Sequence, residues 1–395
     1  MRKRRIAIAG AGLAGLYAAA ALARRGCEVI VCERAPALGE AGAGIQISPN
    51  GAKMLARIGA LAPVETLAFQ PEAAEMRLGV SGATILHLPL GAAAEARWRA
   101  PYLQVHRADL LAAITVAARE AGAEIRLGTP VSGAADRPEG AALLLDGGDA
   151  IEADAVLGAD GIRSSVRAAL FDDDPPRFTG QVAWRGTVPT SALPPRRVNP
   201  TATVWVGPGR HLVTYYLRRG EIVNFVAVQE RQAWTEEDWS APGDIAALRT
   251  AFGNWHPAAS DVLRAAQRCL IWGLFDRRPL RSWVSGRVAL LGDACHAMLP
   301  FMAQGAVQGF EDGAALARHL GSHDAVPDAL AAYERDRRPR ATRVQMTSRN
   351  NARLFHAAGM VERFWRYAPI AIGGRVAPSL AMGRLDWLYG HVEPA

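Results

Sequence analysis

The chain has 395 residues, 50% of them hydrophobic and 21% charged, and its formal net charge is +7. This length and composition predict a large buried core in one large domain or two interwoven domains, and no apolar run approaches the roughly 20 residues of a membrane span. The positive charge comes from arginines scattered along the chain, so we expect neither a nucleic-acid partner nor a membrane partner.

Cysteine usage indicates a reducing compartment. The sequence has four cysteines without the CxxC spacing of a metal site: Cys27, Cys32, Cys269 and Cys295. So few thiols in so long a chain predict neither a disulfide framework nor a zinc site. We therefore expect a cytoplasmic protein without a bound metal.

The N-terminal segment is consistent with a dinucleotide-binding unit or with a secretory signal peptide. Residues 6–15 read IAIAGAGLAG, and they predict a strand, a glycine turn and a helix over 13–25, followed by a strand over 28–32 that ends at Glu33. The basic start MRKRR and the small residues after it fit a signal peptide. The second strand favours the nucleotide interpretation, because a cleaved signal has no reason to supply it.

Each glycine of this motif has its own part in nucleotide binding. Gly10 permits the tight turn, Gly12 lets the backbone approach a pyrophosphate, and Gly15 lets the helix pack on the strand. The helix amino terminus offers unpaired NH groups and a positive dipole to the phosphates. Glu33 has the spacing of a carboxylate that accepts hydrogen bonds from the ribose hydroxyls.

The following stretch returns to a βαβ rhythm after a glycine-rich loop over 38–46, which is a candidate ligand-facing segment. Helices are predicted over 49–58 and 107–121, and strands within 77–90 and over 103–105, 124–127, 143–145 and 153–161. The last of these strands ends at an Asp160-Gly161 turn.

The sequence pattern changes after residue 180. Successive strands separated by Pro, Gly and charged turns predict an antiparallel sheet over 182–188, 201–206, 211–217 and 222–228. A helix over 245–252 and a strand over 268–273 follow, and residues 287–293 resume the nucleotide-domain pattern. A helical region begins near Ala329, and we expect Pro339 to interrupt it. The fold class is therefore α/β, with a doubly wound Rossmann-like domain interleaved with a mixed or antiparallel-sheet domain and a C-terminal helical region.

A second motif, whose residues could bind a cofactor, follows the strand near residue 290. The sequence GDACHAMLPFMAQGA over 292–306 places Asp293 at a strand end and a new helix start soon after it. An aspartate there can bond a polyol hydroxyl, and the helix NH groups can stabilise negative charge on a bound ring. FAD has both a ribityl chain and such a ring. The alternative is that Asp293 only caps a turn.

Three motifs together resemble the single-component FAD-dependent aromatic hydroxylases, the group that contains p-hydroxybenzoate hydroxylase, and within it the salicylate and 6-hydroxynicotinate hydroxylase branch. They are the segments 10–33, 158–167 (GADGIRSSVR) and 292–312. Arg107 also matches an FAD-contacting arginine of that family. Two positions depart from the family's Gly-Gln-Gly pattern and the Asn that follows it: Ala303 replaces the first glycine, and Val307 stands at the Asn position.

The resemblance implies FAD as the cofactor, NADH or NADPH as a transient electron donor, and O2 transfer through a flavin C4a-hydroperoxide to a small aromatic acid of the salicylate, hydroxybenzoate or hydroxynicotinate type. It implies a monomer or homodimer. The division that it implies is an FAD-binding domain over 1–72, 104–174 and 280–325, a substrate-binding domain over 73–103 and 175–279, and a helical region over 326–395. The cofactor-binding residues that we expect are Gly10, Gly12, Leu13, Ala14, Gly15, Glu33, Arg34, Gly44, Arg107, Val131, Asp160, Asp293, Pro300, Gly305 and Ala306.

Electrophilic hydroxylation calls for a base that deprotonates the ring hydroxyl. On the predicted strand over 211–217, His211, Val213 and Tyr215 share one face. His211 is the candidate base and Tyr215 a candidate partner of the substrate hydroxyl; the alternatives are a structural histidine and a packing tyrosine. His296 is a second histidine to consider, but the resemblance places it in a structural turn.

Three further residues are candidates for shaping the substrate site. Pro300, the third candidate catalytic residue, lacks an NH and would shape the flavin and oxygen cavity. Arg77 and Arg185 are candidates for pairing with a substrate carboxylate, and ordinary salt bridges are their alternative. The segment over 333–340 resembles the family's docking helix, which could line a dimer face.

Two other functions remain open from the sequence. One is an FAD monooxygenase of a larger polyketide, aromatic or quinone precursor, which predicts a wider pocket and no essential carboxylate-binding arginine. The other is a non-oxygenating flavin dehydrogenase or a flavin-binding sensor, which predicts no oxygen incorporation into a product.

Overall fold

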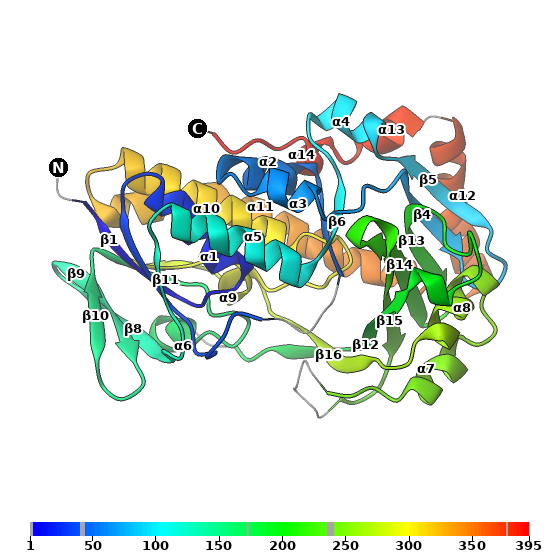
Figure 1. Cartoon of the computed structure of the whole chain (residues 1–395), viewed down its shortest axis with the longest axis horizontal. Coiled ribbons are helices and arrows are strands. Elements are labelled where there is room, and N and C mark those ends of the chain that lie inside the picture. The colour runs from blue at the N-terminus through cyan, green and yellow to red at the C-terminus, as the bar shows by residue number, and fades with distance from the viewer. Residues whose placement is uncertain (1–2, 40–43, 172–173, 235–240, 377, 395) are drawn as a thin grey trace.

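A parallel sheet organises the N-terminal part of the chain in this computed structural model, which describes residues 3–39, 44–171, 174–234, 241–376 and 378–394 (Figure 1). The sheet has six strands in the order β17-β18-β11-β1-β2-β7. Their bounds are β1 (Arg5–Ala9), β2 (Glu28–Cys32), β7 (Glu124–Arg126), β11 (Ala155–Gly158), β17 (Val284–Ser285) and β18 (Val288–Leu290). All neighbours are parallel except β17 and β18. The residues from Ile6 to Ala9 and from Val29 to Cys32 are buried, as in a parallel sheet covered on both faces.

Helices cover this sheet, and small residues let two of them pack closely. A Cβ atom on Gly309 of α10 (Gly305–Ser322) would come within 2.7 Å of Ala14 Cβ in α1 (Leu13–Ala23). Glycine therefore allows the two helices to touch near the nucleotide turn. The other helices are α2 (Pro49–Arg57), α3 (Leu61–Glu65), α4 (Ala92–Trp98), α5 (Arg107–Glu120), α6 (Ser165–Leu170), α7 (Ile245–Phe252), α8 (Pro257–Ala265), α9 (Asp293–His296), α11 (Val326–Phe355), α12 (Met360–Val376), α13 (Pro378–Gly383) and α14 (Asp386–Tyr389).

The long helix α11 corrects one expectation, because it runs unbroken through Pro339. A proline at this position removes one backbone hydrogen bond, the one that the carbonyl of Arg335 would accept. Both Arg335 and Pro339 are exposed, so water can bond the freed carbonyl. Arg337 and Arg340 hold the two sides of Pro339 by ion pairs to Glu311 of α10, and tertiary contact thus outweighs the local helix-breaking tendency.

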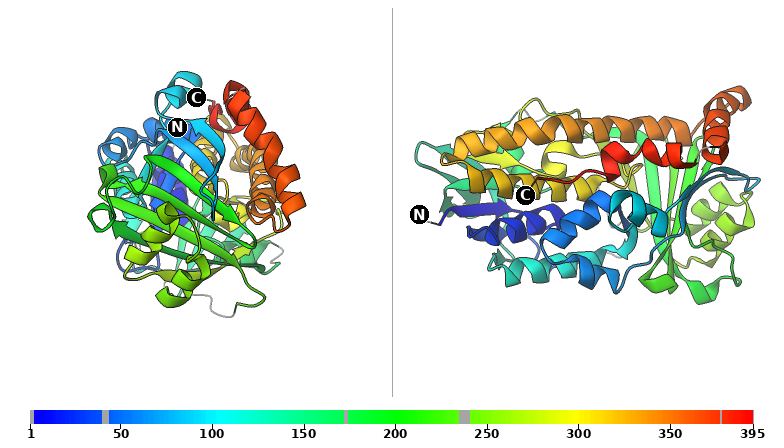
Figure 2. Two further views of the ribbon diagram at one scale, coloured as in Figure 1. Left: turned by 90° about the vertical axis from the view of Figure 1, so that its right-hand side faces the viewer. Right: turned by 90° about the horizontal axis from the view of Figure 1, so that it is seen from above.

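A seven-stranded sheet forms the other end of the molecule, and α11 runs from the parallel sheet to it (Figures 1 and 2). Its order is β16-β12-β15-β14-β13-β4-β5, with only β4 and β13 parallel to each other. The bounds are β4 (Ala73–Leu78), β5 (Thr84–Pro89), β12 (Arg177–Pro189), β13 (Thr201–Gly207), β14 (Arg210–Leu217), β15 (Ile222–Glu230) and β16 (Leu270–Asp276). In the register His211 faces Val228, and Tyr215 faces Asn224, which confirms that His211 and Tyr215 share a face.

Two smaller sheets complete the described residues. One is antiparallel and contains β8 (Val131–Arg137), β9 (Gly140–Leu145) and β10 (Ala150–Ala153); the other pairs β3 (Gly44–Ile47) with β6 (Leu103–His106). Short 3-10 turns lie at Thr190–Ala192 and Arg218–Gly220. Of the predicted glycine-rich loop, residues 40–43 lie outside the described residues. Within the described ranges, no helix has both the length and the apolar character needed to cross a bilayer. The domain boundaries stay a prediction.

Candidate active site

A cavity of about 980 Å³ is lined on one side by segments that follow strands of the parallel sheet, among them Gly12, Ala159 and Gly292, and on another by strands of the seven-stranded sheet. The starts of α1 and α10 supply one part of its lining. Arg185 of β12, Val226 of β15 and Trp272 of β16 supply another. A volume near the upper end of the roughly 300–1,000 Å³ typical of ligand pockets indicates space for a large cofactor with a small molecule beside it.

The glycine turn between β1 and α1 has the geometry expected of a nucleotide-binding turn. Gly10 has a φ of +96°, and a Cβ on it would lie 2.6 Å from the Ala159 carbonyl oxygen. A Cβ on Gly15 would collide with the Gly10 carbonyl. Gly12 borders the cavity, and nothing lies within 4 Å of its would-be Cβ. The turn is therefore closed at Gly10 and Gly15 and open at Gly12, where a pyrophosphate could approach.

Glu33 lies at the end of β2 beside this turn. Its Oε2 accepts a hydrogen bond from the backbone NH of Ala11 (2.8 Å), and its Oε1 accepts one from Ala35 (3.0 Å). A carboxylate retains further lone pairs after two such bonds, so ribose hydroxyls can still donate to it. Leu13 and Ala14 line the cavity.

Other predicted cofactor residues are divided between the cavity wall and its surroundings. Gly44 and Arg107 line the cavity. Arg34 is exposed and outside the lining, and Val131 packs against the core while its neighbour Ser132 lines the cavity.

Asp160 provides the clearest sign that this region accommodates a polar ligand. Its Oδ2 accepts hydrogen bonds from the backbone NH groups of Ser165 (2.7 Å) and Val166 (3.2 Å). Its Oδ1 is buried and has no partner within the described residues. The residues on either side, Ala159 and Gly161, line the cavity. An unpaired buried acceptor at this place fits a ligand hydroxyl, as FAD carries.

The second motif borders the same cavity. Asp293, Pro300, Gly305 and Ala306 all line it. Gly305 begins α10, and nothing lies within 4 Å of its would-be Cβ, which leaves the helix amino terminus open to a negatively charged ring. The cavity thus joins the glycine turn and this motif, which lie about 280 residues apart in the chain.

The two departures from the family pattern have structural consequences. Ala303 adopts a φ of +52°, a left-handed conformation in which the family's glycine would be unstrained. Val307 is fully buried, and a Cβ on Gly51 would lie 2.7 Å from its Cγ2. Val307 therefore packs into the core at the position where the family has a polar side chain.

The predicted catalytic residues on β14 are buried, and neither belongs to the lining of the cavity. The His211 ring packs against Phe301, the neighbour of the cavity residue Pro300, with 4.9 Å between ring centroids. Burial, with a smaller contribution from His356, lowers the pKa of His211 well below its usual value. Burial raises the pKa of Tyr215, whose ring lies where a Gly44 side chain would be. His211 is therefore neutral at neutral pH, as a base must be.

The two candidate arginines differ in their surroundings. Arg77 forms a 2.8 Å ion pair with Glu75 and lies outside the cavity lining. Arg185 lines the cavity, and its guanidinium lies 4.6 Å from the ring centroid of Trp272. Of these two arginines, only Arg185 borders the cavity, whose lining also includes Arg107, Arg163 and Arg277.

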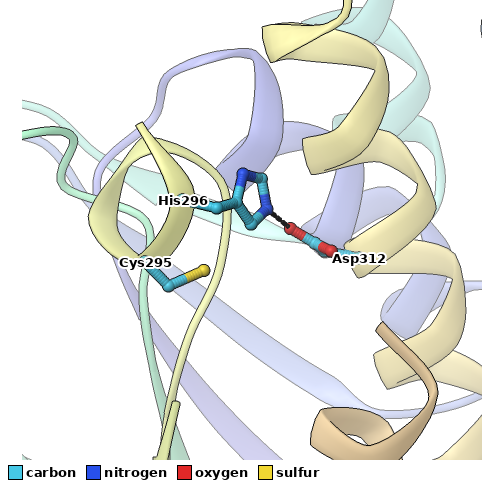
Figure 3. Close-up of side chains that lie close together, drawn as sticks. All are labelled: Cys295, His296 and Asp312. Carbon is cyan, nitrogen blue, oxygen red and sulfur yellow. Dashed lines mark hydrogen bonds and ion pairs between the residues drawn. The ribbon is translucent and has the colours of Figure 1, made fainter. Parts of the chain in front are cut away.

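Cys295 and His296 of the second motif form a buried cluster with Asp312 of α10 (Figure 3). His296 Nε2 is 2.5 Å from Asp312 Oδ2, and Arg337 Nε donates to Asp312 Oδ1 at 2.9 Å. Burial raises the pKa of the Cys295 thiol well above its usual value, whereas a metal requires a thiolate. Arg337 already supplies the positive charge, so the cluster has the chemistry of an ion pair that ties α9 to α10 and α11.

A polar network beneath α10 was not predicted from the sequence. Gln304, which lines the cavity, donates to Ser48 Oγ (2.7 Å), and Asn50 donates to Gln304 (3.1 Å) and Glu311 (2.8 Å). Gln308 completes the buried set. The spacing of 304, 308 and 311 places these polar residues on one helix face, a signal that was available in the sequence.

The segment over 333–340 has one buried side and one exposed side. Tyr333 is buried and donates to the Leu290 carbonyl (2.8 Å), and Arg337 is 1% exposed. Arg335, Asp336 and Pro339 are exposed, so a dimer face on this segment stays a prediction.

Comparison with known proteins supports FAD binding at this site. The family model described as "FAD binding domain" matches residues 3–348. The 3-amino-4-hydroxybenzoate 2-monooxygenase PtnB3 of Streptomyces platensis is 39% identical over 353 residues, which cover 89% of this chain and 88% of that protein. The 6-hydroxynicotinate 3-monooxygenase of Bordetella bronchiseptica is 37% identical over 357 residues, covering 89% and 92%. A salicylate hydroxylase substrate complex superposes with a TM-score of 0.83 at 27% identity, covering 100% and 99%.

Fold and site therefore define a flavoprotein of the aromatic-hydroxylase class, with FAD as its cofactor. The chain belongs to the FAD binding domain family, among relatives that are aromatic monooxygenases. This confirms the family resemblance, the fold class and the cofactor predicted from the sequence.

Proposed function

We propose that the protein hydroxylates a small aromatic acid, with NADH or NADPH and O2 as co-substrates. The observation that carries the proposal is a single cavity bordered by both flavin motifs and, on the facing sheet, by one arginine over a tryptophan. Relatives named for hydroxybenzoate and hydroxynicotinate hydroxylation support this substrate class.

The residues that would hold FAD follow from the cavity. The α1 start at Gly12 would receive the pyrophosphate, Glu33 and Asp160 the hydroxyl groups, and the α10 start at Gly305 the ring. Bound FAD supplies electrons from the nicotinamide donor and activates O2 for transfer of one oxygen atom to an aromatic ring.

The facing wall would hold the substrate. Arg185 can form a bidentate hydrogen-bonded pair with a carboxylate, and Trp272 holds the guanidinium by a cation–π contact. Val226 and Trp272 offer apolar surface to a ring, and Pro300 lies on the flavin side of the cavity. We keep His211 as the proposed base and Tyr215 as a proposed supporting residue, because both occupy the sheet face that carries Val226.

The test is a screen of NADH and NADPH oxidation by the FAD-loaded protein against salicylate, 3-hydroxybenzoate, 3-amino-4-hydroxybenzoate and 6-hydroxynicotinate, with the mass of each product measured under labelled O2. We expect labelled product from at least one acid. Arg185→Met should raise KM for that acid by about 10-fold or more while FAD binding is retained. Arg77→Met is the matched control and should leave KM unchanged.

Two results would contradict this proposal. Turnover of a larger polyketide or quinone precursor, unaffected by Arg185→Met, would establish the wider-substrate alternative. Reduction of the flavin without labelled oxygen in any product would establish a dehydrogenase or a sensor.

We further propose a cytoplasmic monomer or homodimer. Four cysteines that are all free support a reducing compartment.

A further inference from the structure

A chain of hydrogen bonds leads from His211 to the protein surface. His211 Nδ1 lies 2.7 Å from His356 Nε2, and His356 Nδ1 lies 2.9 Å from Glu230 Oε1. His211 is 1% exposed, the His356 side chain is 3% exposed, and the Glu230 side chain is 55% exposed. One end therefore lies in the interior against Phe301, the neighbour of the cavity residue Pro300, and the other is in water.

Three separate elements supply the residues of this hydrogen-bonded series. His211 belongs to β14, Glu230 is the last residue of β15, and His356 is the residue that follows α11. The Glu230 NH donates to the Gly209 carbonyl (2.9 Å) in the turn between β13 and β14, where Gly209 has a φ of +63°. The turn thus fixes the backbone at the outer end, and the end of α11 supplies the middle ring.

The direction of each hydrogen bond follows from the outer end. An ionised carboxylate has no proton to donate, so His356 must carry its proton on Nδ1 and leave Nε2 as an acceptor. His211 must then carry its proton on Nδ1 and donate it to His356. The Nε2 atom of His211 is left without a proton, and it has no hydrogen-bond partner within the described residues.

We propose that His211, His356 and Glu230 form a relay that carries a proton between the inner face of the seven-stranded sheet and solvent. The proposal deepens the proposed function and rests on it for the source of the proton. Burial lowers the pKa values of both histidines, so neither ring holds an extra proton at rest.

The transfer can be followed proton by proton. A ring hydroxyl loses its proton to His211 Nε2, the Nδ1 proton of His211 passes to His356 Nε2, and the Nδ1 proton of His356 passes to Glu230, which releases a proton to water. The substrate gains one negative charge, and no group is oxidised or reduced. Return of a proton along the same path restores both rings and reprotonates the product.

The first test needs no substrate. In FAD-loaded protein labelled with 15N-histidine, 15N–1H spectra report which nitrogen of each ring carries a proton. We expect both His211 and His356 to be protonated at Nδ1 and bare at Nε2, with the signals assigned by their loss in His211→Gln and His356→Gln. A proton on His211 Nε2 would overturn the relay whatever the enzyme's substrate is.

The second test measures the transfer with 3-amino-4-hydroxybenzoate as the probe. Rapid mixing with the FAD-loaded protein should produce the absorbance of the bound phenolate. His356→Gln and Glu230→Gln should slow its appearance by about 10-fold or more, with an unchanged dissociation constant and FAD content. Glu221→Gln, an exposed carboxylate just before β15, is the control and should keep the wild-type rate.

Rescue separates a relay from a merely structural role. Imidazole added to His356→Gly should restore the phenolate rate, because it can occupy the space of the missing ring next to exposed Glu230. Wild-type rates in both His356→Gln and Glu230→Gln would overturn the relay. Failure of the probe to bind would count against the proposed substrate class, while the ring-proton measurement would still decide the relay.

Discussion

The molecule holds two histidine clusters that differ in where their hydrogen bonds end. His296 bonds Asp312, which is fully buried and also receives a hydrogen bond from Arg337. His211 bonds His356, which bonds the exposed carboxylate of Glu230. The first, which we call the closed cluster, is made of buried side chains, and the second, which we call the open chain, ends at a carboxylate in water.

Burial of a histidine therefore does not by itself reveal its role. A closed network leaves a proton nowhere to go, so its hydrogen bonds serve to hold elements together. An open chain offers a proton an exit, and its inner atom can serve as a base. Substitutions in the first cluster should therefore lower the stability of the fold, and substitutions in the second should lower the reaction rate.

The largest effect on stability should come from removing Arg337, which pairs with Asp312 of the closed cluster. Arg337→Met leaves the buried carboxylates of Glu311 and Asp312 short of a cation, and we expect a loss of about 3–5 kcal/mol in the free energy of unfolding. Urea unfolding measures this value. Arg338→Met, which removes an exposed pair with Glu334 one position along α11, should cost no more than about 0.5 kcal/mol. Equal losses in the two variants would refute the distinction.

The next largest effect should be that of acid on Glu311, which shares Arg337 with the closed cluster. Burial alone would raise the pKa of Glu311, but Arg337 and Arg340 outweigh it and lower the pKa to about 2. Because this pKa is lower in the folded state than in the unfolded state, Glu311 stabilises the fold above about pH 4.5 and loses that contribution as the pH falls toward 2, on the order of 3 kcal/mol. Unfolding curves at several pH values should show a shallower acid dependence in Glu311→Gln. Identical slopes would show that Glu311 is not the group responsible.

A substitution in the open chain should change the rate of hydroxylation rather than the stability of the fold. His211→Ala should lower the rate of hydroxylation about 100-fold, because the proposed base is lost, while the dissociation constant for FAD changes little. Steady-state turnover and flavin fluorescence measure the two quantities. His87→Ala, at a half-exposed histidine of β5, is the control. Equal hydroxylation rates in His211→Ala and wild type would remove His211 from the mechanism.

The smallest effect should be that of Glu230→Gln on stability. Since the Glu230 side chain is 55% exposed, its bond to His356 should contribute only about 0–1 kcal/mol. Thermal and urea unfolding should therefore be nearly unchanged, although proton transfer slows. A loss comparable to that of Arg337→Met would make this cluster structural as well.

Local patterns account for the parts of the molecule that the sequence predicted. The glycine turn at Gly10 and Gly15 follows from close backbone approaches that only glycine permits. The strand alternation that placed His211 and Tyr215 on one face follows from the period of two in a strand. These constraints act within a few residues, so one sequence is enough to read them.

Contacts between distant segments decided the rest. Pro339 was predicted to interrupt a helical region, but α11 is continuous there, and ion pairs to Glu311 hold it on both sides of the proline. Arg77 and Arg185 both stand in strands, and only their places in the sheet separate a salt bridge from a cavity residue.

A nucleotide-binding α/β fold with two flavin motifs could be predicted from the amino-acid sequence alone, because glycine geometry and hydrophobic period are local properties. The folded chain was needed to show that Arg185 borders the cavity, that His296 bonds Asp312, and that His211 connects to water through a histidine 145 residues away. Hydrogen bonds and ion pairs depend on which side chains the fold brings within about 3 Å of each other, and no spacing along the chain encodes that distance.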